Sequence, residues 1–380
     1  MTGSGHPASA TFSASDHAHM ARALRLAARG LTTTQPNPRV GCVIARDDAI
    51  VGEGWHQRVG GPHAEVFSLR EAADRARGAS AYVTLEPCGL HGRTPPCADA
   101  LIAAGIARVV IASDDPNQRA GGALDRLRDA GIEIETGLMR EAARELNRGF
   151  FSRIERGRPW LRVKLAMSLD GRTALANGES KWISGAAARA DVQRWRARSS
   201  MILTGIGTVF ADDPQLTVRL DVDSGAAADA DHFNPLRVVL DRNLRTPRGA
   251  HVLDGTVPSL LLHAHDVMPV DDRFANVELI AVESGLPRLD LDDVLRVLAT
   301  RGANEVQVEA GPTLCGALFS AGLVDELLLY VAPVLLGEAA NPLLSLPPLN
   351  EMGARWNLHV IEQRSVGDDL RLLLRPGRST

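Results

Sequence analysis

In the first 150 residues, short apolar runs alternate with segments whose apolar positions recur at helical spacing. The apolar runs predict strands at Val40–Ala45, Ile50–Trp55, Ala81–Leu85, Arg108–Ala112 and Ile132–Glu135. The helical spacing predicts helices at His17–Arg29, Pro62–Ala76, Ala98–Ala104, Leu124–Ala130 and Met139–Arg148. Because strands alternate with helices, the pattern indicates a layered α/β sheet.

The alternation restarts after Arg156-Gly157-Arg158-Pro159, whose glycine and proline indicate a linker. Strands are predicted at Trp160–Met167, Met201–Thr204, Arg237–Leu240, Ser259–Leu262, Glu305–Glu309, Glu326–Val331, Trp356–Arg364 and Leu370–Leu374. Helices are predicted at Ala186–Arg198, Leu291–Thr300 and Thr313–Ala321, and a loop at Asp221–Phe233. We therefore expect a disordered leader over residues 1–15, an α/β domain over 16–150 and a second over 157–380.

Composition narrows the class of protein. A length of 380 residues accommodates two domains of ordinary size. A net charge of −4 and an aromatic content of 4% disfavour nucleic-acid binding, which usually requires a basic face with aromatic side chains. The chain has no apolar run of the roughly 18 residues that a membrane span needs. Its four cysteines make no disulfide framework, so we expect a cytoplasmic protein.

One constellation points to specific chemistry. His63 and Glu65 lie at the start of a predicted helix, Cys88 follows a predicted strand, and Cys97 comes nine residues later. His-x-Glu followed by Pro-Cys and a second Cys is the zinc signature of hydrolytic deaminases. One imidazole and two thiolates leave the fourth tetrahedral position of the metal open for water, whereas a structural site is closed by four protein ligands. The sequence therefore predicts that His63, Cys88 and Cys97 bind Zn²⁺ and that Glu65 is the catalytic proton shuttle.

Three residues near this constellation are candidate substrate ligands. Asn37 lies in a loop bracketed by prolines and offers an amide to a pyrimidine edge; the alternative is a simple Asx turn. His56 ends a predicted strand and is either a substrate contact or a surface histidine. Arg93 lies between the two zinc cysteines and suits a phosphate.

Longer motifs then resemble one enzyme family. They are Thr34–Ile44, Pro62–Val66, Val83–Cys88 and His91–Cys97 in the first half, and Lys164–Thr173, Ser180–Ser184, Ala211–Arg219 and Val308–Leu314 in the second. Together they resemble the bifunctional riboflavin-biosynthesis deaminase/reductases over roughly residues 16–375, in the family's order.

The resemblance implies a cytidine-deaminase-like three-layer α/β/α domain followed by a dihydrofolate-reductase-like α/β domain. The first domain would deaminate 2,5-diamino-6-(5-phosphoribosylamino)pyrimidin-4(3H)-one with zinc. The second would reduce the ribosyl group to ribityl with NADPH, so the expected partner is a small pyrimidine phosphoriboside. We also expect a homo-oligomer that associates through the C-terminal domain.

The resemblance also assigns residues in the second half. Positions implied to line the NADPH site are Ala166, Trp182, Ser184, Thr208, Asp212 and the run Gly311, Pro312, Thr313, Leu314, Cys315, Gly316 and Ala317. Positions implied to contact substrate are Ser180, Arg196, Leu216, Arg219 and Glu309, of which the two arginines suit the substrate phosphate. Without the resemblance, Trp182 would equally be a core residue. Lys164 and Asp170, at the two ends of the first strand, are candidates to assist proton transfer.

The sequence departs from the family pattern in two places. Leu90 stands where the family commonly has a histidine and cannot donate a hydrogen bond. Arg242 stands where the family often has serine, and we expect it to meet a cofactor phosphate.

Two other function classes fit parts of the sequence. A nucleoside or tRNA deaminase with a non-catalytic C-terminal module would release ammonia from its substrate without consuming NADPH. A zinc-stabilised regulatory protein would have a closed metal site and no turnover, and would leave Glu65 without a role.

Overall fold

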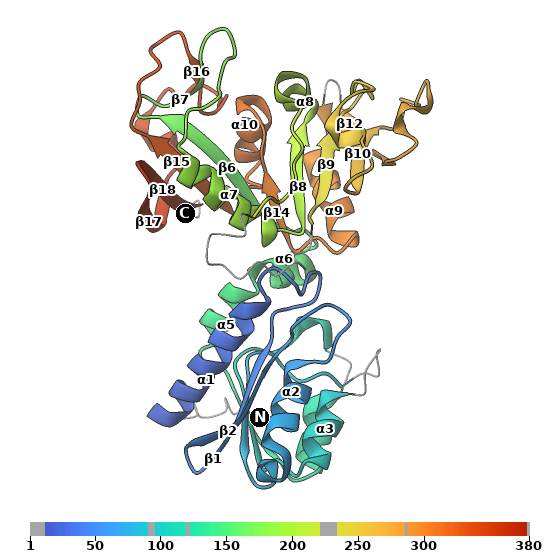
Figure 1. Ribbon diagram of the computed structural model, residues 1–380, viewed down its shortest axis with the longest axis vertical. Coiled ribbons are helices and arrows are strands. Elements are labelled where there is room, and N and C mark those ends of the chain that lie inside the picture. Colours follow the sequence, from blue (N-terminus) through green and yellow to red (C-terminus); the bar gives the residue numbers. More distant parts are fainter. Residues whose placement is uncertain (1–11, 90–95, 119–121, 221–233, 286–287, 378–380) are drawn as a thin grey trace, which may run out of the picture. The chain divides into compact units, whose positions relative to one another are not determined.

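The computed structural model of the protein describes residues 12–89, 96–118, 122–220, 234–285 and 288–377. The chain divides into two compact units, Met1–Glu155 and Arg156–Thr380, each with its own sheet (Figure 1). Three sequence features, the Asp221–Phe233 loop, Arg93 and Leu90, lie outside the described residues.

The first unit is built on a five-stranded sheet in the order β2-β1-β3-β4-β5. The strands are β1 (Gly41–Arg46), β2 (Ala49–Trp55), β3 (Ser80–Val83), β4 (Arg108–Ile111) and β5 (Glu133–Thr136). Strand β1 runs antiparallel to both β2 and β3, whereas β3, β4 and β5 are parallel. The helices are α1 (Ala14–Ala27), α2 (Ala64–Ala72), α3 (Cys97–Ala103), α4 (Ala123–Asp129), α5 (Arg140–Leu146) and α6 (Arg148–Arg156).

Because successive side chains of a strand point to opposite faces of the sheet, the strands contribute to two separate cores. Cys42 and Ile44 of β1 pack in a core with α2, α3 and α4. Val43 and Ala45 pack on the opposite face in a core with α1 and α5. The sheet is therefore covered by helices on both faces, and the expected three-layer α/β/α domain is confirmed.

Helix α1 starts upstream of the boundary expected at residue 16. It begins at Ala14, and Ser13 and Asp16 form a reciprocal capping box. Asp16 also accepts hydrogen bonds from Tyr82 Oη at 2.8 Å and Arg108 Nη1 at 2.7 Å, which hold the helix on the sheet. Residues that were expected in the leader thus belong to the helix and its cap.

Glycines on β1 and β2 bring helix backbones unusually close to the sheet. A Cβ added to Gly54 would lie 2.3 Å from the Ala64 carbonyl oxygen, and one on Gly52 would lie 2.2 Å from that of Ser68. The backbone of α2 therefore lies directly against β2. Because Ala64 is the first residue of α2, this contact fixes where the helix begins.

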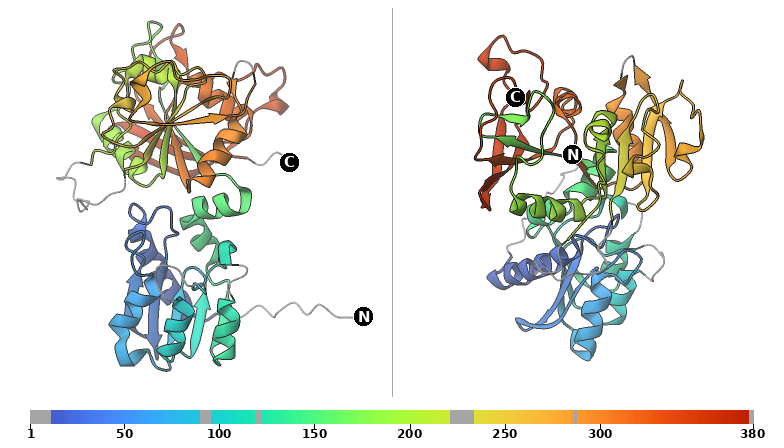
Figure 2. Two further views of the ribbon diagram at one scale, coloured as in Figure 1. Left: turned by 90° about the vertical axis from the view of Figure 1, so that its right-hand side faces the viewer. Right: turned by 45° about the horizontal axis from the view of Figure 1, so that its top comes forward.

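The second unit is built on a nine-stranded sheet in the order β11-β10-β9-β8-β14-β6-β15-β18-β17 (Figure 2). These strands are β6 (Trp160–Ser168), β8 (Met201–Gly205), β9 (Leu236–Leu240), β10 (Ser259–Ala264), β11 (Glu278–Val282), β14 (Glu305–Val308), β15 (Glu326–Ala332), β17 (Leu358–Val366) and β18 (Asp369–Pro376). Only β18 and β17 run antiparallel to their neighbours among the strands of this sheet. Two short pairs are separate: β7 (Arg172–Ala174) with β16 (Asn341–Pro342), and β12 (Ser284–Gly285) with β13 (Arg288–Leu289).

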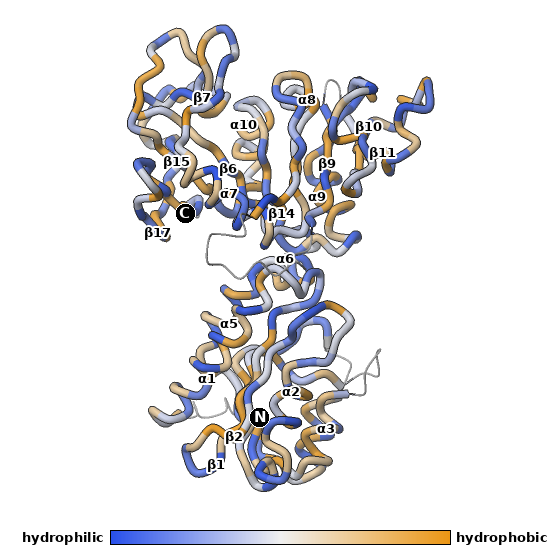
Figure 3. Tube along the Cα trace, viewed as in Figure 1, coloured by the Kyte–Doolittle hydropathy of each residue, from blue (hydrophilic) through white to orange (hydrophobic). Residues whose placement is uncertain are grey.

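Helices cover both faces of this sheet. They are α7 (Ala186–Ala197), α8 (Ile206–Asp212), α9 (Leu291–Thr300) and α10 (Pro312–Ser320). Helices α9 and α10 pack in one core with the apolar strands, of which β9 is visibly hydrophobic in Figure 3. Helices α7 and α8 pack in cores on the other face. The expected α/β class is confirmed, while α6, β7, α8, β11, β12, β13 and β16 were not predicted from the sequence.

A buried ion cluster joins the central strands. Arg162 of β6 donates to Glu326 and Glu305 at 2.7 Å each, and all three side chains are fully buried. Its guanidinium also lies 4.5 Å from the ring centroid of Trp195 on α7. Because each charge is paired, the cluster stabilises only as a set, and the loss of one member leaves a buried unpaired charge.

We predict that Gly54→Ala destabilises the first unit by about 2 kcal/mol, because the added methyl group overlaps the Ala64 carbonyl and forces α2 outward. Thermal unfolding of the full chain and its metal content measure the effect. Gly249→Ala is the control, since a Cβ there meets no atom within 4 Å among the described residues. Unchanged stability and metal content in Gly54→Ala would contradict the close-packing interpretation.

Candidate active sites

Three predicted metal ligands converge at helix and strand ends in the first unit. His63 is the N-cap of α2, Cys88 follows β3, and Cys97 is the first residue of α3. His63 Nδ1 lies 3.2 Å from Cys97 Sγ and 3.5 Å from Cys88 Sγ, and the three ligand atoms lie within 4.8 Å of one another. A tetrahedral zinc ion with bonds of about 2.0–2.3 Å requires ligand atoms at such separations. The donor set therefore fits Zn²⁺.

The protonation states of the cysteines also fit a dication. Hydrogen bonds from Cys97 and His63 lower the pKa of the Cys88 thiol to about 4, so Cys88 is a thiolate at neutral pH. The pKa of Cys97 is raised by the hydrogen bond that its thiol makes to Cys88, and burial raises it further. A bound dication favours the charged form of both sulfurs and allows both to be thiolates.

Glu65 lies in the first turn of α2, beside this cluster. Its side chain is buried, and its Oε2 atom has no hydrogen-bond partner among the described residues. Burial raises the pKa of the carboxyl group, while the charge of His63 partly offsets the rise. A buried carboxylate oxygen that receives no hydrogen bond from a protein group is suited to accept a proton from water or from a substrate.

Asn37 and His56 are joined by a hydrogen bond, and His56 lies beside the same cluster. His56 Nδ1 lies 3.0 Å from the Pro62 carbonyl oxygen, which only accepts, so Nδ1 carries the proton. Burial lowers the pKa of His56, so the ring is neutral and its Nε2 accepts from Asn37 Nδ2 at 3.2 Å. The His56 and His63 rings meet edge to face with centroids 5.5 Å apart. His56 is thus no surface histidine, and the carbonyl oxygen of the Asn37 amide is left for another partner.

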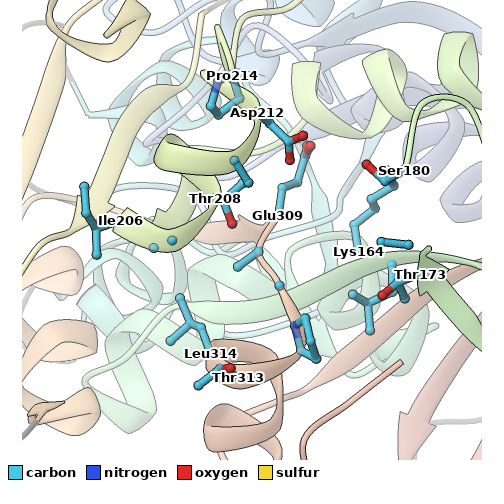
Figure 4. A pocket seen from close by; sticks show the side chains of 18 of the residues that line it. Lys164, Thr173, Ser180, Ile206, Thr208, Asp212, Pro214, Glu309, Thr313 and Leu314 are labelled. Atoms are coloured by element: carbon cyan, nitrogen blue, oxygen red, sulfur yellow. The ribbon is translucent and has the colours of Figure 1, made fainter. Parts of the chain in front are cut away.

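The second unit contains a cavity of about 880 Å³ at the carboxyl ends of β6, β8, β9 and β14. Figure 4 shows Lys164, Ser180, Glu309 and Thr313 around it, together with Thr208 and Asp212, which both lie on α8. The predicted residues that line it are Ala166, Ser180, Trp182, Ser184, Arg196, Thr208, Asp212, Leu216, Arg242, Glu309, Gly311, Pro312, Thr313, Leu314 and Ala317. The sequence-based assignments thus largely fall on one cavity.

Three of the residues assigned to the cofactor and substrate sites do not line this cavity. Cys315 is fully buried in the core and donates to the Ala310 carbonyl at 3.3 Å. Gly316 is buried on the same helix, where a Cβ would lie 2.2 Å from the Ser345 carbonyl oxygen. Arg219 is exposed and donates to Gln215 at 3.1 Å. The first turn of α10 faces the cavity, whereas Cys315 and Gly316 lie on the buried side of the same helix.

Arg196 and Glu309 are engaged with each other inside the cavity wall. Arg196 Nε and Nη2 each donate to the Glu309 carboxylate at 2.7 Å, and Nη1 donates to the Thr217 carbonyl. Although burial raises it, the pKa of Glu309 is lowered to about 2 by the charge of Arg196. This pairing leaves Arg196 poorly placed as the phosphate ligand that the sequence suggested. Arg196 instead holds a carboxylate in position.

Lys164 and Asp170 have different surroundings. Burial lowers the pKa of Lys164, which lines the cavity near Glu309. Asp170 is outside the cavity lining and accepts from the Gly337 backbone N–H at 2.8 Å and from Leu336. Hydrogen bonds from Ser168 and from Gly337 lower the pKa of Asp170 to about 2. Asp170 therefore anchors a loop, and of the two candidates only Lys164 faces the cavity.

Trp182 is 70% exposed, so it is not a core residue, and the Arg189 guanidinium lies 4.5 Å from its ring centroid.

Sequence reasoning missed several cavity residues. Arg245, Asn243 and Arg288 line the cavity but were not assigned to it. Arg245 and Asn243 follow β9 within three residues of Arg242, a proximity that was the available signal.

Comparison with known proteins shows what this arrangement resembles. A model described as the RibD C-terminal domain matches residues 159–370, and one described as the cytidine and deoxycytidylate deaminase zinc-binding region matches residues 13–113. The riboflavin biosynthesis protein RibD of Escherichia coli is 49% identical over 94% of this chain and 99% of its own. The chain belongs to the RibD family. These matches confirm the expected bifunctional deaminase and reductase of riboflavin biosynthesis.

Solved structures of RibD proteins have the same fold. Acinetobacter baumannii RibD superposes with a TM-score of 0.88 at 42% identity, covering 96% of this chain and 99% of its own. A Thermotoga maritima protein described as a diaminohydroxyphosphoribosylaminopyrimidine deaminase/5-amino-6-(5-phosphoribosylamino)uracil reductase gives a TM-score of 0.83 at 31% identity, over 96% and 99% of the two chains. Within the described ranges, no helix is long and apolar enough to cross a membrane.

We predict that Cys88→Ser weakens zinc binding more than tenfold, because it removes one of three protein ligands. Metal analysis after dialysis against a weak chelator measures the loss. Cys315→Ser, a buried cysteine outside the cluster, should retain the wild-type zinc content. Equal zinc in Cys88→Ser and wild type would refute the ligand assignment.

Proposed function

We propose that His63, Cys88 and Cys97 hold zinc and that Glu65 moves the protons of a hydrolytic deamination of 2,5-diamino-6-(5-phosphoribosylamino)pyrimidin-4(3H)-one. The single observation that carries this proposal is the buried Glu65 carboxylate, which has an unpartnered oxygen beside a three-ligand cluster. Zinc, when bound, lowers the pKa of a water molecule and so supplies a nucleophile at neutral pH.

Glu65 accepts one proton from the attacking water and passes it to the ring nitrogen. It then accepts the remaining proton from the hydroxyl group of the tetrahedral adduct and passes it to the amino group, which leaves as ammonia. Its burial suits this role, because a raised pKa makes the carboxylate a better base and its conjugate acid able to release the proton. The neutral His56 fixes the Asn37 amide through the 3.2 Å contact, so that the amide oxygen faces an amino group of the pyrimidine. Arg93 remains our candidate for the substrate phosphate in this domain.

We predict that Glu65→Gln retains zinc but slows deamination about 10³-fold, because the amide cannot carry the proton. A coupled assay with the diaminopyrimidine follows ammonia release and NADPH oxidation together. The variant should then show neither ammonia release nor NADPH oxidation. Addition of the deaminated intermediate should restore NADPH oxidation, which distinguishes a lost first step from a misfolded chain. Ammonia release at the wild-type rate would refute the shuttle role.

For the second step, we propose that the cavity binds NADPH and the ribosylaminouracil, with NADPH supplying the hydride that reduces the sugar carbon. The Gly311 N-cap of α10 makes no side-chain cap hydrogen bond, and Pro312 at the first position has no N–H, so the backbone N–H groups of Thr313 and Leu314 are the ones offered to a phosphate. Arg242 adds a positive group whose buried Nε has no partner among the described residues. These two features fit a dinucleotide that carries several phosphates.

Inside the cavity, Lys164 and Glu309 contact the substrate in this proposal. The lowered pKa of Lys164 makes its ammonium group a readier proton donor at neutral pH than a solvated lysine. Arg196 keeps Glu309 ionised and oriented, and Ser180 and Leu216 complete the substrate side of the cavity.

We predict that Arg242→Ala lowers NADPH affinity about tenfold and leaves NADH affinity nearly unchanged, since only NADPH offers the additional phosphate. Titration of cofactor binding measures both dissociation constants. Arg248→Ala is the matched control, because Arg248 pairs with Asp272 and does not line the cavity. An unchanged NADPH-to-NADH preference in Arg242→Ala would overturn the assignment.

Three further inferences concern the whole chain. We infer a homo-oligomer that associates through the C-terminal domain. A cytoplasmic location is supported by four cysteines that are all free. We also propose that residues 16–150 and 157–380 are independent domains, supported by their separate cores and sheets.

A further inference from the structure

Gln307 of β14 is a buried amide that reaches the reductase cavity only through another residue. Its side chain is 0% exposed, and Gln307 does not line the cavity. Gln307 Nε2 donates a hydrogen bond of 2.8 Å to Glu309 Oε1, and Glu309 does line the cavity (Figure 4). The amide therefore contacts a cavity carboxylate from the interior of the protein.

This contact allows only one orientation of the amide. The Glu309 carboxylate accepts hydrogen bonds, so the amide nitrogen must face it, and the reversed amide would bring two acceptors together. Gln307 Oε1 is then left without a hydrogen-bond partner among the described residues. A buried acceptor without a partner destabilises the fold, and an apolar side chain of the same size would avoid that cost. The presence of an amide here therefore calls for a role other than stability.

The neighbouring strand contributes a positive charge that favours the same orientation. Arg162 of β6 is the register partner of Gln307, and its Nη1 atom also has no partner in the described part of the chain. Side chains in register on parallel strands lie on one face of the sheet. The guanidinium of Arg162 therefore attracts the oxygen of the amide, which leaves the NH₂ group for Glu309.

Glu309 is held by donors from two different elements. Arg196 of α7 donates to both carboxylate oxygens at 2.7 Å, and Gln307 adds a further hydrogen bond to Oε1. Helix α7 lies on a face of the sheet, whereas Gln307 belongs to the sheet itself, next to the strand that carries Lys164. The Gln307 hydrogen bond thus ties the carboxylate to the same strands that place Lys164 in the cavity.

We propose that Gln307 is a positioning residue for the reduction step, which holds the Glu309 carboxylate in the orientation that meets the ribosylaminouracil. This proposal rests on the proposed function, in which Glu309 contacts that substrate. Gln307 itself touches neither substrate nor cofactor, because it lies behind the cavity wall.

The electrostatics of Glu309 give the proposal a pH signature. Burial raises the pKa of Glu309, but Arg196, Lys164 and the Gln307 amide together lower it to about 2. From β15, the Tyr330 phenol also faces this group, and its pKa is raised by burial and by nearby carboxylates that include Glu309. Loss of the Gln307 donor leaves the other groups in place and raises the pKa of Glu309. Substrate binding that needs the ionised carboxylate is then lost at a higher pH as the pH falls.

The first experiment measures steady-state reduction of the ribosylaminouracil by the full chain. Gln307→Met keeps the size of the side chain but cannot donate, so the KM for the ribosylaminouracil should rise about tenfold while the KM for NADPH stays unchanged. Val306→Ala is the control, because Val306 is fully buried and its side chain points to the opposite face of the same strand. It should lower the unfolding temperature and keep both KM values of the wild type.

A second experiment measures kcat/KM for the ribosylaminouracil against pH. The acidic limb should move to higher pH in Gln307→Met and further in Gln307→Glu, which places a second carboxyl group beside Glu309. Either variant alone is sufficient for the test. Titration of the substrate is common to all variants, so a difference between their profiles reports the protein.

Glu309→Gln separates this proposal from the one on which it rests. A wild-type KM for the ribosylaminouracil in Glu309→Gln overturns the substrate contact of Glu309 and the role of Gln307 with it. A raised KM in Glu309→Gln, with a wild-type KM and pH profile in the Gln307 variants, overturns the role of Gln307 alone. The same holds if Val306→Ala reproduces the changes of Gln307→Met. A raised KM and a shifted acidic limb in the Gln307 variants, both absent from Val306→Ala, support the proposal.

Discussion

The contact between the backbone of α2 and the glycines of β2 is the constraint on which the deaminase site depends. Gly54 and Gly52 allow carbonyl groups of the helix to lie where a Cβ would otherwise be. Because His63 caps α2 and Glu65 lies in its first turn, the depth of that helix sets the position of one metal ligand and of the proton shuttle. The site is therefore held by a main-chain contact that no side-chain substitution at the site itself would reveal.

The zinc site was predictable because its chemistry restricts residue types at short spacing. A His-x-Glu and two cysteines allow few alternatives, and the structure brings the three ligand atoms within 4.8 Å. The surroundings were harder to predict. The 3.2 Å contact between Asn37 and His56 joins residues from two loops, and no sequence pattern encodes which nitrogen of a histidine carries the proton.

The reductase cavity was predicted less completely, for two physical reasons. Its wall combines segments far apart in the chain, so a residue such as Arg288 carries no local signal. Charged residues in it also find partners: Arg196 was expected to bind phosphate, yet its guanidinium is committed to Glu309. Most strands were predictable from apolar runs, whereas the short helix α8 and the two-residue strands have too few residues for a periodic pattern.

The buried Arg162 cluster belongs to a longer polar stripe. Along β14 and just beyond it, Glu305, Gln307 and Glu309 alternate with valines, and Arg162 and Lys164 alternate likewise on β6. The stripe runs from a fully buried salt bridge to the cavity, so the residues that hold the sheet together and those that line the cavity share one face. Replacing one charged residue of this stripe by a neutral one leaves its partner as an unpaired charge in the protein interior. A substitution at Glu305 is therefore tolerated only together with one at Arg162. Among related sequences, substitutions at these two positions should be found together or not at all.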